Sequence, residues 1–222
     1  MPRPPTIETM TSILITGANK GLGKATARLL VEHGHTVHLG ARDAVRGQAA
    51  ADEIGARFVQ LDVTDDASVS AAFAQLDALD VLVNNAGIAS GLGGVEALDG
   101  PSVLATYNTN VAGDTPVVVN VSSALGSFAA THDPSRPAFT FPSIVYGSSK
   151  AAVSMLTVQY AKAYPGIRFN AVEPGITATE LGGAPHPGRP GEESARLVVR
   201  LAEIGVDGPT GTFWEDDGVL GW

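Results

Sequence analysis

Short runs of β-branched and other apolar residues alternate along the chain with longer segments of helical periodicity. The apolar runs predict strands at residues 13–15, 36–39, 57–61, 80–83, 117–121, 167–172 and 212–214. The periodic segments predict helices at residues 23–31, 44–54, 64–76, 101–112, 143–163 and 192–204, and Thr64 is the expected N-cap of the third. Such alternation is typical of an α/β fold in which a doubly wound parallel sheet carries helices on both faces.

Polar side chains follow several of the expected strands. They are Thr16, Asp62, Asn84, Ser123 and Glu173. In a parallel sheet the carboxyl ends of the strands share one edge, and ligands bind there. We therefore expect these residues to lie in one cleft. Glu173 has no evident acidic partner, and we assign it a supporting role.

Three glycines, Gly17, Gly21 and Gly23, follow the first strand and open the first helix. Glycine lets the backbone turn tightly and approach a pyrophosphate, whose charge then lies at the helix N-terminus. The spacing is GxxxGxG rather than GxGxxG, and a tight turn without a ligand is the alternative. The strand-to-helix context favours the phosphate site.

Tyr146 and Lys150 are four residues apart, so a helix places both on one face. A free phenol titrates near ~10, and lowering this pKa to about 7 takes roughly 4 kcal/mol. A cation at ~4 Å supplies about that much at an effective dielectric constant of 20. Lys150 and an oxidised nicotinamide ring are suitable cations, which makes Tyr146 a candidate general acid and base. The alternative is a Tyr–Lys pair that has this spacing by chance.

Composition limits the other possibilities. The chain has 222 residues, of which 44% are hydrophobic and 17% charged, and its net charge of -9 disfavours a nucleic-acid partner. The absence of cysteine excludes disulfides and thiolate metal sites, and the five histidines show no metal-ligand spacing, so no metal is expected. No run reaches the roughly 18 apolar residues of a membrane span. We expect a cytoplasmic protein with a disordered tail at residues 1–10 and a single domain at residues 11–222.

Five motifs occur in a characteristic order. They are TGANKGLG at residues 16–23, NNAG at 84–87, Val121-Ser122-Ser123, YGSSK at 146–150 and Pro174-Gly175. In this order the chain resembles the short-chain dehydrogenase/reductase family from about residue 11 to residue 218. The terminal segment GPTGTFWEDDG makes its bacterial carbonyl-reductase-like branch the most similar. The resemblance implies a single-domain Rossmann fold of about seven strands, and an NAD(P)-dependent oxidoreductase that acts on a small carbonyl or alcohol.

The resemblance also implies roles for individual residues. The cofactor-binding positions would be Gly17, Asn19, Lys20, Gly21, Leu22, Gly23, Arg42, Asp62, Val63, Asn84, Ala86, Gly87, Tyr146, Lys150, Pro174, Gly175, Ile176 and Thr179. Asp62 and Val63 would flank the adenine, and Ile176 and Thr179 would bind the carboxamide or the pyrophosphate. For Asn84 and Asn85, a turn whose side chains bond their own backbone is the alternative.

The catalytic set implied by the resemblance is Ser123, Tyr146, Lys150 and Asn110. Ser123 would orient the substrate oxygen. Lys150 would also bond the nicotinamide ribose, and Asn110 would support a water relay to this lysine.

The segment after the second strand bears on the choice of cofactor. An NAD site usually places an acid there to bind the ribose 2′-hydroxyl, but no acid precedes Arg42 in residues 39–43. Lys20 and Arg42 would favour a 2′-phosphate if they converge on one ribose. We therefore predict NADPH over NADH. The alternatives are that both cations are solvated surface groups, or that Asp43 points inward and opposes the phosphate.

The segment after Asn110 departs from the family. Six residues separate Asn110 from Val117, whereas relatives continue the helix well past this asparagine. A strand of about five residues spans ~17 Å, so the helix and the usual place of Asn110 cannot both be kept. A cofactor-binding sensor or scaffold without turnover is therefore the alternative function, with a sugar epimerase or dehydratase a weaker one. The long segment between Ser123 and Tyr146 favours a monomer over a homodimer.

Overall fold

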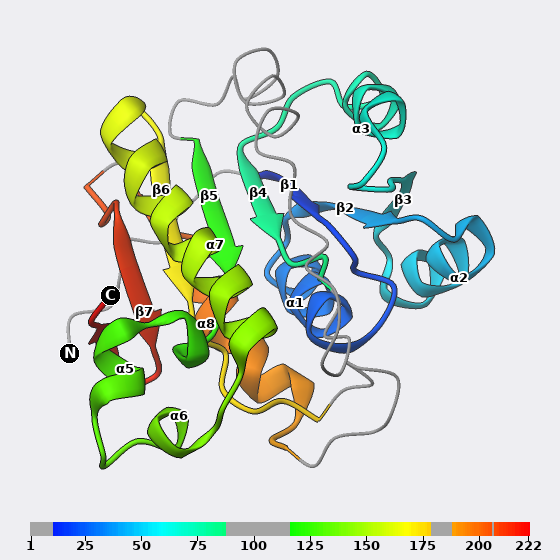
Figure 1. The fold of residues 1–222 in the computed structure, drawn as a ribbon. Helices are drawn as coiled ribbons and strands as arrows, with labels where there is room; N and C mark the ends of the chain where they lie inside the picture. The colour runs from blue at the N-terminus through cyan, green and yellow to red at the C-terminus, as the bar shows by residue number, and fades with distance from the viewer. Residues whose placement is uncertain (1–10, 88–115, 179–187, 206) are drawn as a thin grey trace.

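The computed structural model describes residues 11–87, 116–178, 188–205 and 207–222 (Figure 1). Within these residues eight strands form one sheet in the order β3-β2-β1-β4-β5-β6-β7-β8. The strands are β1 Ser12–Ile15, β2 Thr36–Ala41, β3 Arg57–Gln60, β4 Val81–Asn84, β5 Val117–Val121, β6 Arg168–Val172, β7 Thr212–Glu215 and β8 Gly218–Leu220. Neighbouring strands are parallel except β7 and β8, which are antiparallel.

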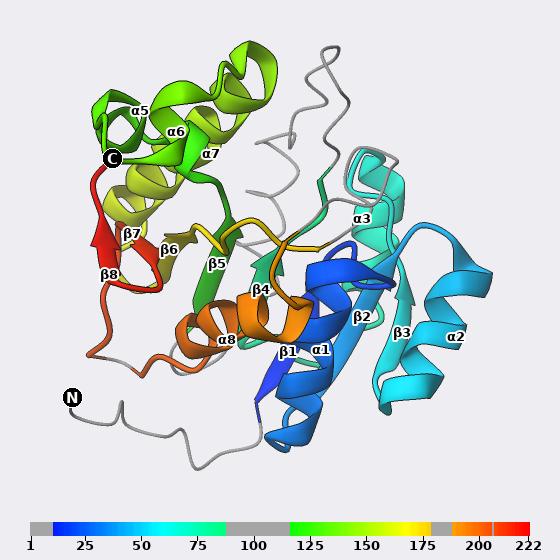
Figure 2. The ribbon, with the colours of Figure 1, turned by 90° about the horizontal axis from the view of Figure 1, so that it is seen from below.

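Helices cover both faces of this sheet. They are α1 Gly21–Glu32, α2 Ala44–Ile54, α3 Asp66–Phe73, α5 Phe128–His132, α6 Pro137–Thr140, α7 Ile144–Ala163 and α8 Gly191–Ala202, with a 3-10 turn η1 at Ala124–Gly126. Figure 2 shows α1 and α8 together on one side of the sheet and α7 on the other. The expected doubly wound α/β fold is therefore confirmed.

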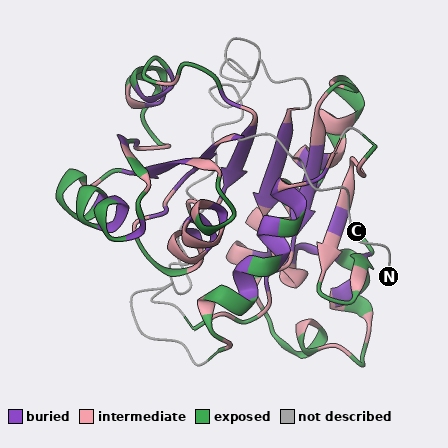
Figure 3. Cartoon of the chain, turned by 180° about the vertical axis from the view of Figure 1, so that it is seen from behind, coloured by how far each residue is buried: buried purple, intermediate pink, exposed green. Residues whose placement is uncertain are grey.

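The strand pattern explains the two layers. Ile13 and Ile15 pack with the buried residues of α1 and α8, while Leu14, between them, packs with those of α3 on the opposite face. Successive side chains of a strand point to opposite faces, so a strand that is apolar at every position needs cover on both sides. Figure 3 shows the result, with buried strands inside and exposed residues on the outer surfaces of the helices.

Two details differ from the expectations, and two further expectations are not tested. The third helix begins at Asp66 and its N-cap is Asp65, not Thr64, because the Asp65 carboxylate accepts the Ala67 N–H at 2.9 Å. The Thr64 hydroxyl instead donates to the Asp62 carboxylate at 2.7 Å. The seven expected strands are joined by an eighth, β8. The expected helix at 101–112 and the tail at 1–10 lie outside the described residues.

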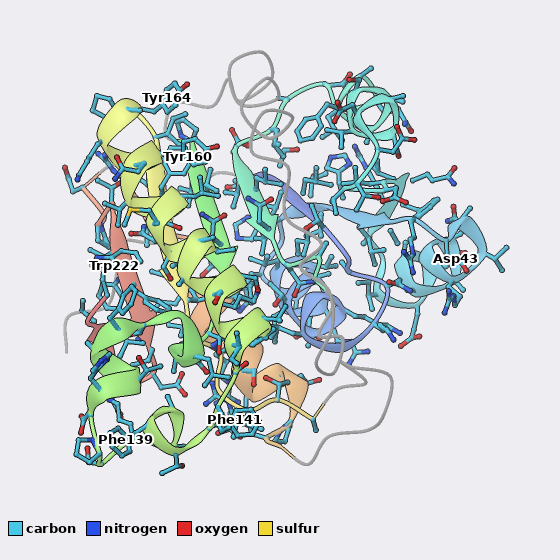
Figure 4. The ribbon with its side chains drawn as sticks, in the orientation of Figure 1. Asp43, Phe139, Phe141, Tyr160, Tyr164 and Trp222 are labelled. Carbon is cyan, nitrogen blue, oxygen red and sulfur yellow. The ribbon has the colours of Figure 1, made fainter. Side chains whose placement is uncertain are left out.

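The segment between Ser123 and Tyr146 folds against the C-terminal strands. Arg136 forms a two-pronged ion pair with Glu215 of β7, at 2.9 and 2.7 Å. Trp222 stacks on Phe213 with ring centroids 5.4 Å apart, and its carbonyl accepts the Ala129 N–H. Figure 4 places Trp222 beside β7, while Tyr160 and Tyr164 lie at the far end of α7. None of the described helices is long and apolar enough to cross a membrane.

Candidate active site

The strand register brings the expected polar residues to one edge of the sheet. Ile15 lies opposite Val83, Asn84 opposite Asn120, and Val121 opposite Val172. The segments that follow β1, β4, β5 and β6 therefore emerge side by side. These segments carry the glycine turn, the NNAG motif, Ser123 and Glu173.

The glycine turn packs directly against the NNAG segment. Gly17 has φ +62°, and a Cβ there would lie 2.8 Å from the Cα of Ala86. A Cβ on Gly23 would lie 2.4 Å from Nδ2 of Asn85. Gly17 therefore leaves room for the backbone of Ala86, and Gly23 leaves room for the side chain of Asn85.

Asn85 holds the two segments together. Its Nδ2 donates to the carbonyls of Thr16 and Gly17 at 2.8 and 3.1 Å, and the Thr16 hydroxyl accepts the Asn85 and Ala86 N–H groups. Asn84 is buried and donates to Asn120 Oδ1 at 2.9 Å. The alternative in which the Asn84 and Asn85 side chains bond their own backbone is therefore wrong. We did not assign Asn85 a role from the sequence, although its place in the motif was the available signal.

The N-terminus of α1 is suited to an anion. Its N-cap, Lys20, makes no side-chain capping bond, and its first turn holds no acidic residue. By contrast, Asp43 caps α2 and Asp65 caps α3. The first amide groups of a helix need acceptors, and the diphosphate of a dinucleotide supplies them. The glycine turn and this uncapped helix therefore fit a nicotinamide dinucleotide.

The residues expected to select the cofactor lie beside this turn. Lys20 and Arg42 are exposed, and none of the ion pairs among the described residues involves Arg42. The Asp43 carboxylate accepts the Arg46 backbone N–H at 2.9 Å and pairs with the Arg46 side chain at 2.8 Å. These bonds to Arg46 lower the pKa of Asp43. The Asp43 carboxylate is therefore engaged at the N-terminus of α2, where Figure 4 labels it.

Asp62 and Val63 follow β3, at the same edge. The Asp62 carboxylate accepts the backbone N–H and the hydroxyl of Thr64, at 3.0 and 2.7 Å. These two bonds hold the pKa of Asp62 below its ordinary value, with a smaller contribution from the charge of Arg42. Asp62 is therefore ionised at neutral pH and fixed in its turn.

Ser123, Tyr146 and Lys150 meet where β5 ends against the start of α7. Close packing of backbone makes this possible, since a Cβ on Gly126 would lie 2.5 Å from the carbonyl carbon of Lys150. A Cβ on Gly147 would lie 2.9 Å from the Leu125 carbonyl oxygen. Glycine at these positions lets η1 contact the first turns of α7.

Lys150 is anchored and partly buried. Its Nζ donates to the Val121 carbonyl at 2.8 Å and lies 5.7 Å from the centre of the Tyr146 ring. Burial lowers the pKa of Lys150 to about 8, and the charge of Glu173 opposes this change. Lys150 therefore holds its proton less tightly than a solvent-exposed lysine does.

Tyr146 differs from the expectation. Burial raises its pKa to about 12, the charge of Glu173 raises it further, and hydrogen bonding with the Ser123 side chain opposes the rise. The sequence predicted that Lys150 lowers this pKa. In the protein without cofactor that prediction is wrong: burial disfavours the charged phenolate, and this desolvation is the largest contribution to the pKa.

Glu173 is a site residue whose contacts the sequence did not reveal. Its partly buried carboxylate accepts the backbone N–H groups of Ala124 and Gly175, the latter at 2.8 Å. Burial raises its pKa, and these two N–H groups and the Ser123 side chain oppose the rise. The Ala124 and Gly175 donors are backbone groups, which no pattern of residue types in the sequence indicates.

The Pro174-Gly175 turn completes the edge. Gly175 has φ +74°, and the Arg189 side chain donates to the Pro174 carbonyl behind it. Ile176 is 72% exposed. Asn110 and Thr179 lie outside the described residues. Within the described part of the chain, no group of three or more His, Asp or Glu residues is placed to hold a metal ion.

Comparison with known proteins agrees with this arrangement. Residues 11–188 match the short chain dehydrogenase family. The chain belongs to the short-chain dehydrogenase/reductase family. As a member of it, the protein is an NAD(P)-dependent oxidoreductase.

Individual relatives of the short-chain dehydrogenase/reductase family span most of the chain. Cis-4-hydroxycyclohexanecarboxylate dehydrogenase of Sinomonas cyclohexanicum is 35% identical, covering 85% of this chain and 82% of the relative. Carbonyl reductase [NADPH] 1 of Sus scrofa is 33% identical, covering 94% and 93%. The NADPH-bound carbonyl reductase from chicken fatty liver superposes with a TM-score of 0.75 at 25% identity, covering 96% of this chain and 99% of that structure.

Proposed function

We propose that the protein is an NADPH-dependent reductase that converts the carbonyl of a ketone, aldehyde or quinone to an alcohol. The observation that carries the proposal is the meeting of Ser123, Tyr146 and Lys150 at the strand edge beside an uncapped helix N-terminus. A phosphate site and a proton donor at one edge are what hydride transfer to a carbonyl requires.

The bound nicotinamide supplies the hydride, and the chain supplies the rest. The Ser123 hydroxyl donates to the substrate oxygen and orients it. The Tyr146 phenol gives its proton to the same oxygen as the C=O bond becomes a single bond. The Lys150 ammonium donates one N–H to the Val121 carbonyl. Its two other N–H groups are left to bond the nicotinamide ribose and to face the Tyr146 phenol.

The phenol of Tyr146 is protonated before the reaction begins. Its pKa of about 12 keeps the phenol protonated at neutral pH, so the acid is loaded before the substrate binds. Glu173 and desolvation hold the proton there, and Ser123 favours its release. Oxidation of an alcohol would instead need the phenolate, which these protein groups disfavour.

Preference for NADPH is supported by the charges near the glycine turn. Arg42 is exposed after β2 and Lys20 is exposed before α1, while the carboxylate of Asp43 is engaged by Arg46. Names of two similar proteins, a carbonyl reductase of Sus scrofa and one from chicken, include NADPH. A guanidinium is the group that matches a phosphate in charge and geometry.

Fluorescence titration with NADPH and with NADH tests this function. Wild type is expected to prefer NADPH, and Arg42→Ala to weaken NADPH binding by about tenfold while leaving NADH binding unchanged. Arg57→Ala is the matched control, since Arg57 is exposed at the amino end of β3, and it should change neither affinity. If Arg42→Ala left the NADPH affinity unchanged, the 2′-phosphate assignment would be wrong.

A panel of ketones, aldehydes and quinones with NADPH then tests the reaction. Turnover is expected with at least one class. NADPH binding without turnover across the panel would favour a cofactor-binding sensor or scaffold instead. The cytoplasmic location and the choice between monomer and homodimer stay predictions.

A further inference from the structure

Glu173 joins two turns of the site with one carboxylate. It follows β6, and its two oxygens accept the backbone N–H of Ala124 and that of Gly175. Ala124 directly follows Ser123 at the end of β5, and Gly175 lies in the turn expected along the cofactor. A substrate-orienting hydroxyl and a cofactor-side turn are therefore held at a fixed separation by the same side chain.

Glu173 places a charged carboxylate at a partly buried position, although a neutral side chain there would lose less hydration free energy. A carboxylate that accepts two backbone N–H groups is a strong acceptor at both oxygens. An amide such as glutamine has a single acceptor oxygen, so it satisfies only one of these donors. The geometry thus selects an acid at this position.

We propose that Glu173 is a positioning residue of the reductase, whose partly buried carboxylate fixes the Ser123 turn against the Pro174-Gly175 turn and keeps a negative charge beside the Tyr146–Lys150 pair. The proposal rests on the reductase function proposed above. It adds to the site a residue that acts through Ser123, Tyr146 and Lys150 rather than on the substrate.

The ionisable groups around Glu173 determine which pKa values change when its charge is removed. Its charge raises the pKa of Tyr146 and that of Lys150. From β7, the charge of Glu215 raises the pKa of Glu173 itself, while Glu215 is paired with Arg136. Neutralising Glu173 is therefore expected to lower the pKa values of both Tyr146 and Lys150.

Arg189 lies on the other side of the Pro174-Gly175 turn. Its guanidinium donates to the Pro174 carbonyl and pairs with Asp216, and Glu193 lies at 4.0 Å. These acids engage the Arg189 guanidinium, so this cation is paired with Asp216 and Glu193 rather than with Glu173.

The direct test follows the side-chain Nζ resonance of Lys150 with pH in the protein without cofactor. The chain has four lysines, so Lys150→Arg identifies the resonance. Glu173→Gln is expected to lower the Lys150 midpoint by about one pH unit, because the opposite charge is gone. Glu215→Gln is the matched control, since it removes a nearby acid whose charge does not act on Lys150, and it should leave the midpoint unchanged. An unchanged midpoint in Glu173→Gln overturns the charge part of the proposal.

A second measurement needs no variant. The backbone amide resonances of Ala124 and Gly175 in wild type are expected to titrate together, with one shared midpoint above the ordinary glutamate range. Separate midpoints, or no titration of either amide, would overturn the shared anchoring. This measurement keeps the proposal testable if Glu173→Gln does not fold.

Kinetics separate this proposal from the reductase function. In Glu173→Gln the alkaline limb of kcat/KM for reduction is expected to move to lower pH, and Glu173→Asp to restore part of the shift because it keeps the charge. A purely structural role would lower kcat without moving the alkaline limb, which would count against the proposal.

If Tyr146→Phe is inactive and Glu173→Gln leaves the alkaline limb in place, the inference about Glu173 fails and the reductase function stands. If Tyr146→Phe is fully active, the assignment of Tyr146 as the proton donor fails. The reductase function itself fails only if wild type reduces none of the carbonyl compounds.

Discussion

The charged groups at the two halves of the sheet edge differ in their exposure to solvent. Where β1 and β4 end, the neutral side chains of Thr16 and Asn85 bond to backbone groups, and the cations Lys20 and Arg42 nearby are exposed. Where β5 and β6 end, the ionisable groups Tyr146, Lys150 and Glu173 are partly buried and their pKa values are shifted. Exposed charges and amides suit binding, whereas desolvated ionisable groups suit proton transfer. The difference indicates a binding half and a reacting half.

Tyr146→Phe gives the sharpest test of this division. The phenyl ring keeps the packing but removes the proton donor, so kcat for reduction is expected to fall by about 10²–10⁴-fold. The dissociation constant for NADPH should change far less, because the glycine turn and the N-terminus of α1 are untouched. Steady-state kinetics and a fluorescence titration measure the two effects.

Tyr164→Phe provides the control for this change. Tyr164 follows the end of the same helix and packs on Phe169, with ring centroids 6.4 Å apart. Its substitution should leave kcat and NADPH binding unchanged. Equal losses in both variants would mean that packing of α7, rather than a proton donor, was being measured.

Gly17→Ala tests the binding half, because Gly17 lies in the glycine turn after β1. Gly17 and Gly34 both have positive φ values, +62° and +91°, so alanine at either is strained by about 1–2 kcal/mol. The new Cβ also clashes with Ala86 at position 17 but meets nothing within 4 Å at position 34. We expect Gly17→Ala to lose NADPH affinity and more unfolding free energy than Gly34→Ala, which should keep its affinity. Urea unfolding and cofactor titration compare the two. Equal behaviour of the two variants would contradict the close approach of the glycine turn to the NNAG segment.

The pH dependence of stability tests the reacting half. The pKa of Lys150 is about 8 in the folded protein and 10.5 ordinarily. Between these values the unfolded chain holds the proton that the folded protein has released, so this group contributes stability that rises with pH, by about 1.4 kcal/mol per pH unit. From pH 8 to 9.5, wild type should therefore gain about 2 kcal/mol relative to Lys150→Met, measured by urea unfolding without cofactor. A difference that does not change with pH would mean that Lys150 keeps its ordinary pKa.

The sequence predicted what depends on periodicity and chain order. The seven strands β1 to β7, their parallel direction and the shared edge of Thr16, Ser123 and Glu173 follow from apolar runs that alternate with helices. The N-cap at Asp65 rather than Thr64 was missed because Asp62 engages the Thr64 hydroxyl, a competition between neighbours that residue types do not reveal. Strand β8 has three residues, too few for a periodic signal.

The electrostatics of the site could not be predicted in the same way. The distance rule for a cation and a phenol ignores desolvation, and desolvation determines the pKa of Tyr146 here. Glu173 was placed at the edge, but its partners are the amides of Ala124 and Gly175, which every residue except proline offers. Only a folded backbone shows which amides a side chain can reach.

The contact between Gly126 and the backbone of Lys150 has a consequence for how this protein can diversify. No side chain separates η1 from α7 at that point, so even one added carbon must displace the lysine. Farther along the same segment, Phe139 and Phe141 are 51% and 65% exposed and can be exchanged without such a penalty. Libraries that aim at new substrates are therefore best restricted to positions after η1, with residue 126 left as glycine.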